Sequence, residues 1–236
     1  MTRPIQILTG VTLLLGLDGL APTPVTNGNE DDPSVPFAVA SIRLEQNATD
    51  GDVEIVIEAK GGKDGLAKLT VVSPDGRTVV GFTAPDSSTL GIRQFRFESP
   101  EPKAVERLKS AYPEGVYQFA GATAAGSRLR GESRLSHKLP APAAFERPQA
   151  DTRGVGARGL EITWTPIRNL SAYIVYLEQP ELNVEITARV PGSAAGFAVP
   201  DGFLLPGTEY QLGLGTVSRE GNISFVETTF TTAGKE

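Results

Sequence analysis

The chain has 236 residues and a net charge of −6, and its 26 glycines and 18 prolines are spread along the whole length. It contains no cysteine, which excludes disulfides, thiolate metal sites, thiol nucleophiles and a lipidated cysteine. An acidic chain lacks the basic surface that phosphate binding requires, so we expect no nucleic-acid partner. Turn-forming residues spaced between apolar alternations predict many short strands, and hence an all-β protein.

Residues 1–21 are predicted to be a secretory signal peptide. Arg3 precedes an apolar run that ends near Ala21. The run is shorter than the roughly 20 residues of a membrane-spanning helix. Because residues 17–21 match a cleavage site poorly, a retained anchor stays an alternative, and no other transmembrane span is expected. Either reading predicts an exported protein, located in the periplasm, at the cell surface or outside the cell.

Two segments rich in proline divide the rest of the chain. Residues 22–36 have no apolar periodicity and too few hydrophobic side chains to offset the entropy of ordering, so we expect a disordered linker. A second break, rich in proline and alanine, lies at 139–144. We therefore predict two β-sandwich domains, residues 37–139 and 140–236.

The first domain is predicted to contain strands, tight turns and one short helix. Val53, Ile55 and Ile57 alternate with more polar residues, as in a half-buried strand. We expect further strands at 67–72, 78–82, 92–97, 115–120 and 127–137, a helix at 102–111, and hairpin turns at 61–65, 73–76 and 124–126.

The end of this domain carries a family resemblance. The pattern Pro113-x-Gly115-x-Tyr117, followed by a glycine turn and a strand, resembles the closing hairpin of bacterial immunoglobulin-like domains. The resemblance implies an immunoglobulin-like sandwich for residues 37–139.

The second domain shows a regular series of alternating segments. We expect strands at 160–165, 172–177, 184–190, 196–199, 210–217 and 224–230, which the lead-in at 142–145 raises to seven.

Residues 141–233 resemble the fibronectin type III family. A tryptophan stands in the second strand, followed by a Tyr-x-Val third strand and a Leu-x-Pro-Gly-Thr-x-Tyr corner. The residues that carry these marks are Trp164, Tyr173, Val175, Leu204, Pro206, Gly207, Thr208 and Tyr210. The resemblance implies structural roles for them, with Trp164 in the core and the Tyr210 hydroxyl bonded back to the corner. It also implies a non-catalytic adhesive or spacer module.

The sequence offers little for catalysis or for a cofactor. His137 is the one histidine, so neither a histidine zinc site nor a conventional serine triad is expected, and we predict no enzyme, cofactor or metal. A scattered pair of carboxylates leaves a small hydrolase of unrecognised type as an alternative. Asn47, Asp50 and Asp52 cluster in one turn, which is read as solvated turn residues or as part of a surface calcium site.

Two predicted surfaces are candidates for binding. Arg128, Arg130 and Arg134 recur at even spacing on one strand, so they share one face. This ladder is read either as an ordinary solvated face or as a site for an anionic glycan or lipid head group.

The second surface lies on the third strand of the second domain. If Tyr173 and Val175 face the core, Ile174 and Tyr176 face outward. Gly213 and Gly215 on the neighbouring strand leave a flat floor beneath them. This patch is read either as a contact for a partner protein or as a contact with the first domain.

These observations predict an exported, non-catalytic binding, adhesion or structural module. The expected partner is another envelope or extracellular protein. The alternative is an accessory protein that binds cell-envelope polysaccharide or anionic lipid.

Overall fold

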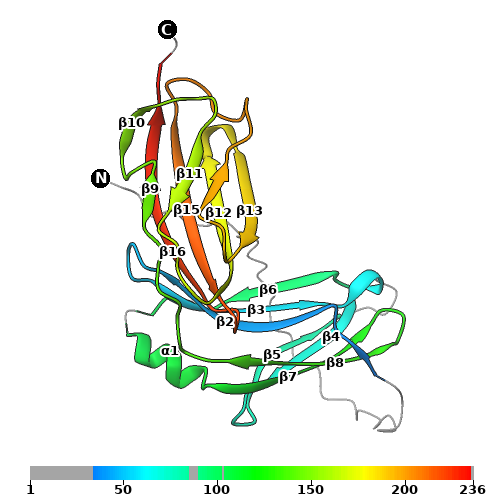
Figure 1. Ribbon diagram of the computed structural model, residues 1–236. Coiled ribbons are helices and arrows are strands. Elements are labelled where there is room, and N and C mark those ends of the chain that lie inside the picture. The colour runs from blue at the N-terminus through cyan, green and yellow to red at the C-terminus, as the bar shows by residue number, and fades with distance from the viewer. Residues whose placement is uncertain (1–33, 85–89, 103, 235–236) are drawn as a thin grey trace. The chain divides into compact units, whose positions relative to one another are not determined.

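The computed structural model describes residues 34–84, 90–102 and 104–234, and the chain from Ser34 onward forms one compact unit (Figure 1). The predicted signal segment and nearly all of the predicted linker lie outside the described residues. No helix among the described residues is long and apolar enough to cross a membrane.

A first sandwich occupies the N-terminal half of the described chain. One sheet has the order β1-β8-β7-β4-β5, and it faces three neighbouring strands of a larger sheet, β2, β3 and β6. The strands are β1 (Val35–Pro36), β2 (Val39–Asn47), β3 (Val53–Lys60), β4 (Leu66–Val72), β5 (Thr78–Thr83), β6 (Gln94–Glu98), β7 (Gly115–Thr123) and β8 (Arg128–Leu135). Inward residues of both layers, such as Leu44, Ile57, Val71 and Phe119, pack into one hydrophobic core.

A second sandwich occupies the C-terminal half. The sheet β14-β11-β9 faces the strands β13-β12-β15-β16, and β10 adds to β16. The strands are β9 (Phe145–Arg147), β10 (Thr152–Val155), β11 (Glu161–Trp164), β12 (Leu170–Gln179), β13 (Val184–Pro191), β14 (Gly196–Ala198), β15 (Glu209–Ser218) and β16 (Ile223–Thr232). Trp164, Tyr173, Tyr210 and Phe230 fill the centre of its core. The predicted all-β architecture of two β-sandwiches is confirmed.

In the first half every expected strand segment contains an observed strand, and two of the three expected hairpin turns are confirmed. The predicted turns at 73–76 and 124–126 join the antiparallel pairs β4–β5 and β7–β8. Residues 61–65, in contrast, do not close a hairpin. They include the 3-10 turn η1 (Gly62–Asp64) and carry the chain from one sheet to the other, because β3 pairs with β2 and β6 whereas β4 pairs with β5 and β7.

The helix and the strand before it are shorter than expected. The helix α1 (Val105–Ala111) begins at Val105, with Ala104 as an N-cap residue that makes no side-chain cap. The strand predicted from residue 92 begins at Gln94, while Ile92 forms an isolated bridge with Leu66.

One strand that the sequence did not predict joins the two halves. The β2 strand pairs in parallel with β16, in the register Ile223 with Glu45 and Phe225 with Asn47. A single sheet therefore runs from β13 in the second half to β6 in the first. The boundary between domains at 139–140 stays a prediction.

The proline-containing connection at 136–141 is held by polar side chains of the second half. Thr216 donates to the Ala141 carbonyl at 2.9 Å, and Ser224 donates to the Pro140 carbonyl at 2.8 Å. Because prolines supply no N–H for a ladder, carbonyls of this stretch accept from side chains instead.

Candidate interaction surface

The aromatic marks of the second half all lie in its interior. The Trp164 ring is fully buried, with its centroid 5.0 Å from that of Tyr173. The Tyr210 hydroxyl accepts from the Leu205 N–H at 2.8 Å and donates to the Phe203 carbonyl at 3.3 Å. Leu204 is buried beside it, and Gly207 adopts a positive φ of 65° in the adjacent turn. These residues therefore shape the sandwich and present no side chain to a ligand.

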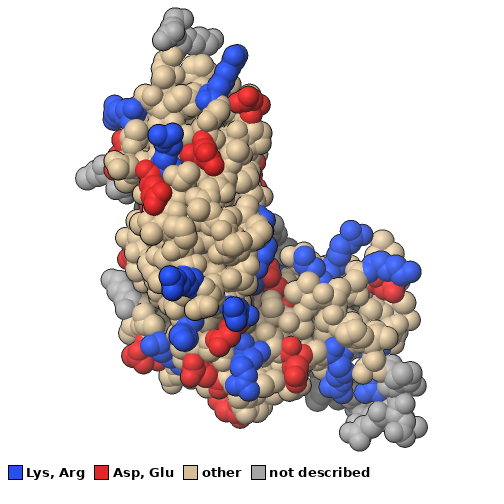
Figure 2. All heavy atoms as spheres, in the orientation of Figure 1, with Lys and Arg blue, Asp and Glu red and all other residues tan. Residues whose placement is uncertain are grey.

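The arginine ladder lies on the outward face of β8. Leu129 and Leu135 turn into the first core, so the residues of opposite parity face outward. Arg130 and Arg134 are exposed, and Arg128 is half-buried. Glu132 lies between Arg130 and Arg134 on the same face, so the ladder mixes charges of both signs. Figure 2 shows the same mixing over the face that it draws, where lysine and arginine are interspersed with aspartate and glutamate.

Ile174 and Tyr176 lie on the outward face of β12. Their neighbours Tyr173, Val175 and Leu177 are fully buried in the second core, whereas Ile174 and Tyr176 are half-buried. Ile174 stands opposite Gly215 on β15, and Tyr176 stands opposite Gly213. The alternation of β12 thus brings the two predicted side chains over the two glycines.

A third side chain, from β16, completes this surface. A Cβ atom added at Gly215 would lie 2.7 Å from the ring of Phe225, so that ring rests directly on the glycine backbone. A Cβ at Gly213 would meet Tyr176 at an ordinary 3.5 Å. Residues Ile174, Tyr176 and Phe225, here called the aromatic face, therefore cover the floor that the sequence left bare. Sequence reasoning missed Phe225, although its outward parity on β16 was readable.

Carboxylates border the aromatic face. The Tyr176 hydroxyl donates to Glu178. Burial raises the pKa of Tyr176 above its usual value, and the nearby charges of Glu178, Glu185 and Glu227 raise it further. Burial also raises the pKa of Glu227, although a 2.9 Å hydrogen bond from the Asn47 amide opposes the shift. The face is thus apolar at its centre and has carboxylates beside Tyr176, while Arg189 of β13 lies beside Ile174.

The residues considered for chemistry are engaged in local structure. The His137 ring nitrogen Nε2 lies 2.8 Å from the Tyr112 carbonyl, and the His137 N–H donates to the Glu114 carboxylate. At the predicted turn, the Asn47 side-chain oxygen accepts from the Thr49 N–H and an Asp50 oxygen accepts from the Asp52 N–H. Among the described residues no group of three or more histidine or acidic side chains is placed to hold a metal ion.

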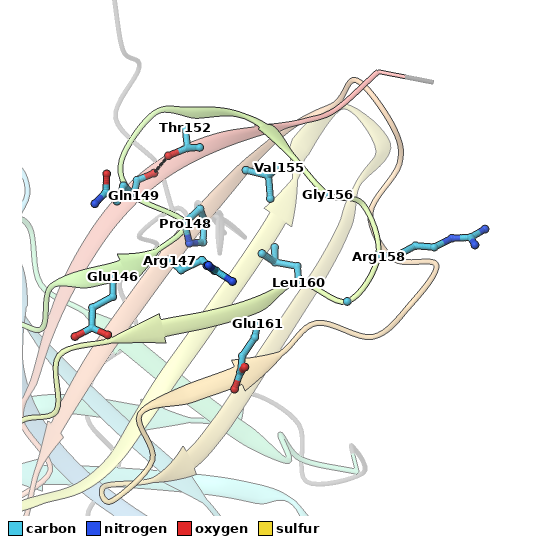
Figure 3. A pocket seen from close by; sticks show the side chains of 11 residues that line it. Glu146, Arg147, Pro148, Gln149, Thr152, Val155, Gly156, Arg158, Leu160 and Glu161 are labelled. Carbon is cyan, nitrogen blue, oxygen red and sulfur yellow. Dashed lines mark hydrogen bonds between the residues drawn. The ribbon is translucent and has the colours of Figure 1, made fainter. Parts of the chain in front are cut away.

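One cleft of about 450 Å³ lies where the chain passes from β9 to β10. The two strands belong to different sheets, so the connection leaves a gap between the layers. Pro148, Val155 and Leu160 line its apolar part, while Arg158 extends away from it (Figure 3). The exposed Glu146 and Glu161 flank the cleft, and the Thr152 hydroxyl in its lining donates to the Gln149 carbonyl at 2.7 Å.

Comparisons with known sequences find no match, and comparisons with solved structures find only matches of low identity and low TM-score. No protein-family model and no curated protein sequence matches the chain. Among solved structures, fibronectin(III)-like modules of Clostridium thermocellum CbhA match with 12% identity and a TM-score of 0.35, over 84% of this chain and 92% of that one. A two-domain fibronectin type III segment of chicken tenascin matches with 15% identity and a TM-score of 0.31, over 81% of this chain and 97% of that one. Identities this low say nothing about a shared ligand.

Proposed function

We propose that this chain is an exported, non-catalytic binding or adhesion module that contacts a partner protein through the aromatic face of Ile174, Tyr176 and Phe225. The observation that carries the proposal is the position of these side chains on the outside of a sheet whose other face forms a packed core. Large side chains that stay half-exposed on a rigid sheet lose little conformational entropy when a partner covers them.

The chemistry of the face favours a protein over a sugar polymer or a lipid surface. Interface centres are enriched in tyrosine and phenylalanine, with polar groups around the rim. Here Ile174 and Phe225 pack on the buried cluster of Ala172, Val217 and Ile223, so the centre is preorganised. The carboxylates of Glu178, Glu185 and Glu227 outnumber the charge of Arg189 beside Ile174, which disfavours an anionic lipid head group.

A pull-down tests the proposal: the full chain is immobilised, and the amount of protein that it retains from an envelope extract is measured. The full chain is compared with a double variant, Ile174→Thr with Tyr176→Ser, after far-UV circular dichroism shows that both are folded. We expect retained protein to fall by roughly tenfold or more, as for other interface anchors. If the double variant retains as much protein as the full chain does, the aromatic face is not the binding surface.

The second candidate, binding to an anionic envelope glycan or lipid, depends on the exposed Arg130 and Arg134 beside Arg128. A matched variant, Arg130→Ser with Arg134→Ser, separates the two candidates. Loss of binding to purified glycan or to anionic vesicles in this variant alone would favour the arginine ladder. Loss of protein partners in the aromatic-face variant alone would favour the first proposal.

Export and the absence of catalysis are parts of the same proposal. N-terminal sequencing of the mature protein tests export, because a signal peptide leaves a new terminus near residue 21. Turnover of an ester or glycoside that disappears in His137→Ala would contradict the non-catalytic part.

A further inference from the structure

The β13 strand leaves one edge of the large sheet open (Figure 1). It pairs along its whole length with β12. The Gly192 N–H donates to the Ser171 carbonyl at 3.3 Å, which sets the alternation of the antiparallel ladder. By that alternation, the backbone groups of Glu185, Thr187 and Arg189 point away from β12, and no strand among the described residues pairs with them.

This edge differs from the other sheet edges that the structure describes. The β5 strand has a register shift against β4, and β9 has one against β11. The β14 and β6 strands have only three and five residues. The β13 strand has eight, in unbroken register with β12. Bulges and short lengths protect many edges, and β13 has neither. Of the other protective features, β13 has Pro191 at its end and the charged Glu185 and Arg189 on its outward side, which leaves the stretch from Glu185 to Arg189 able to pair.

The inward side of β13 can extend the core onto an added strand. Ile186, Ala188 and Val190 pack against the second core but remain partly exposed. No charged residue points inward among them, whereas an inward charge would block pairing. An added strand with apolar residues at alternate positions would bury these three side chains more completely.

The outward side of β13 carries opposite charges at its two ends. Glu185 stands beside Glu178 of β12, so this end is negative, and Arg189 stands beside Ile174 at the other end. Within the described part of the chain none of these three charged side chains forms an ion pair with another residue. Cross-strand pairs of opposite charge stabilise a sheet, so these ends select the charges of an incoming strand.

We propose that the β13 edge binds an extended segment of a partner protein as an added antiparallel strand. The segment alternates apolar residues with polar ones, and it places a cation beside Glu185 and an anion beside Arg189. Main-chain hydrogen bonds from Glu185, Thr187 and Arg189 supply affinity, and the two charges supply register. The inference rests on the proposed function, because it also takes the ligand to be a protein. It adds a second contact for that protein, the β13 edge beside the aromatic face.

A synthetic peptide of sequence Thr-Val-Glu-Val-Thr-Val-Lys-Val, with a fluorophore on its N-terminus and an amidated C-terminus, tests the proposal on the full chain. In antiparallel register its glutamate lies opposite Arg189 and its lysine opposite Glu185. Binding is measured by fluorescence anisotropy, and amide hydrogen exchange identifies the edge that it occupies. We expect slower exchange at Glu185, Thr187 and Arg189, and weaker binding when glutamate and lysine are exchanged in the peptide.

A matched pair of variants tests the main-chain contact. Thr187→Pro removes an outward N–H that β12 does not use, and proline is tolerated at such edge positions. Thr187→Ala keeps the N–H and serves as the control. We expect roughly tenfold weaker binding in Thr187→Pro and no change in Thr187→Ala. If Thr187→Pro is not folded, the double variant Glu185→Lys with Arg189→Glu replaces it and should bind the charge-exchanged peptide better than the original.

Three results would overturn strand addition at β13. They are equal binding by Thr187→Pro and Thr187→Ala, protection of β5 or β6 in place of β13, and a dimer of this chain that Thr187→Pro abolishes while the peptide does not bind. The Ile174→Thr, Tyr176→Ser variant keeps the outward N–H groups and should keep peptide binding. If the peptide does not bind, but the Ile174→Thr, Tyr176→Ser variant still loses its protein partners, strand addition at β13 is disproved and the proposed function of the aromatic face is not.

Discussion

The side-chain oxygen of Asn222 accepts a hydrogen bond from the backbone N–H of Leu44 at 2.9 Å, although the two residues belong to different sandwiches. The Asn222 amide nitrogen donates to the Ser136 carbonyl at 2.9 Å and to the Lys138 carbonyl at 3.1 Å. Asn222 is 1% exposed, so water cannot replace these partners. One side chain of the second half thus satisfies backbone groups of the first half and of the connection between the halves.

Replacement of Asn222 should destabilise the whole chain. Asn222→Ala leaves the buried Leu44 N–H without an acceptor, and we expect a loss of about 1–3 kcal/mol in the free energy of unfolding. Urea unfolding followed by Trp164 fluorescence measures the loss. The exposed Ser193→Ala is the control and should change stability by less than about 0.5 kcal/mol. A loss of that small size in Asn222→Ala would show that the junction relaxes around the missing side chain.

Stability should depend on pH through Glu54. Burial raises the pKa of Glu54 from 4.5 to about 7, and the charges of Glu98 and Glu45 raise it further than Arg96 lowers it. Because the folded-state pKa lies above the unfolded one, the unfolded chain loses this proton first. The free energy of unfolding therefore falls as pH rises from about 4.5 to about 7 and levels off above that range.

Glu54→Gln should remove this pH dependence. Glu54 is partly exposed, so solvent screening reduces the effect, and we expect the variant to be about 1–2 kcal/mol more stable than the original chain at pH 8. The two should be nearly equal at pH 4.5. Urea unfolding at both pH values is the measurement, with the exposed Glu132→Gln as the control. A variant that is less stable at pH 8 would mean that the ionised carboxylate is favourably held.

The two glycines under the aromatic face should respond differently to alanine. At Gly215 the new Cβ would lie 2.7 Å from the Phe225 ring, which must move. We expect Gly215→Ala to cost about 1–3 kcal/mol, as overpacking does. At Gly213 the nearest contact would be 3.5 Å, so Gly213→Ala should be neutral or slightly stabilising. Thermal unfolding of the pair checks the difference, and equal values would mean that Phe225 does not rest on Gly215.

The Tyr210 hydroxyl should matter more than the hydroxyl of Tyr176. Tyr210→Phe removes the acceptor for the Leu205 N–H, and we expect a loss of about 1–2 kcal/mol. Tyr176→Phe is the comparison, because its hydroxyl donates to the half-buried Glu178 and its loss leaves no backbone group without a partner, so we expect a smaller cost of under about 1 kcal/mol. Urea unfolding compares the two, and an equal cost would contradict a special role for the corner.

Much of the second sandwich could be predicted because its information is local. Alternation with a period of two assigns Tyr173, Val175 and Leu177 to the core and Ile174 and Tyr176 to the outside, and a strand offers no other arrangement. Turn residues such as Gly126 mark hairpin ends, since a positive φ is needed there. Residue pattern alone therefore determined that this chain folds into β-sandwiches and which side chains of β12 face outward.

The tertiary structure alone decided which strands meet. The pairing of β2 with β16 joins residues about 180 apart in the sequence, and local pattern contains no signal for a partner at that distance. The same holds for Phe225, whose ring lies over Gly215 because β15 and β16 pair in one register. The alternation of β13 also does not indicate that this strand lies at the end of its sheet in the described part of the chain. Alternation determined the faces of each strand, and only long-range pairing determined the edges and the neighbours, because backbone hydrogen bonds are the same for every sequence.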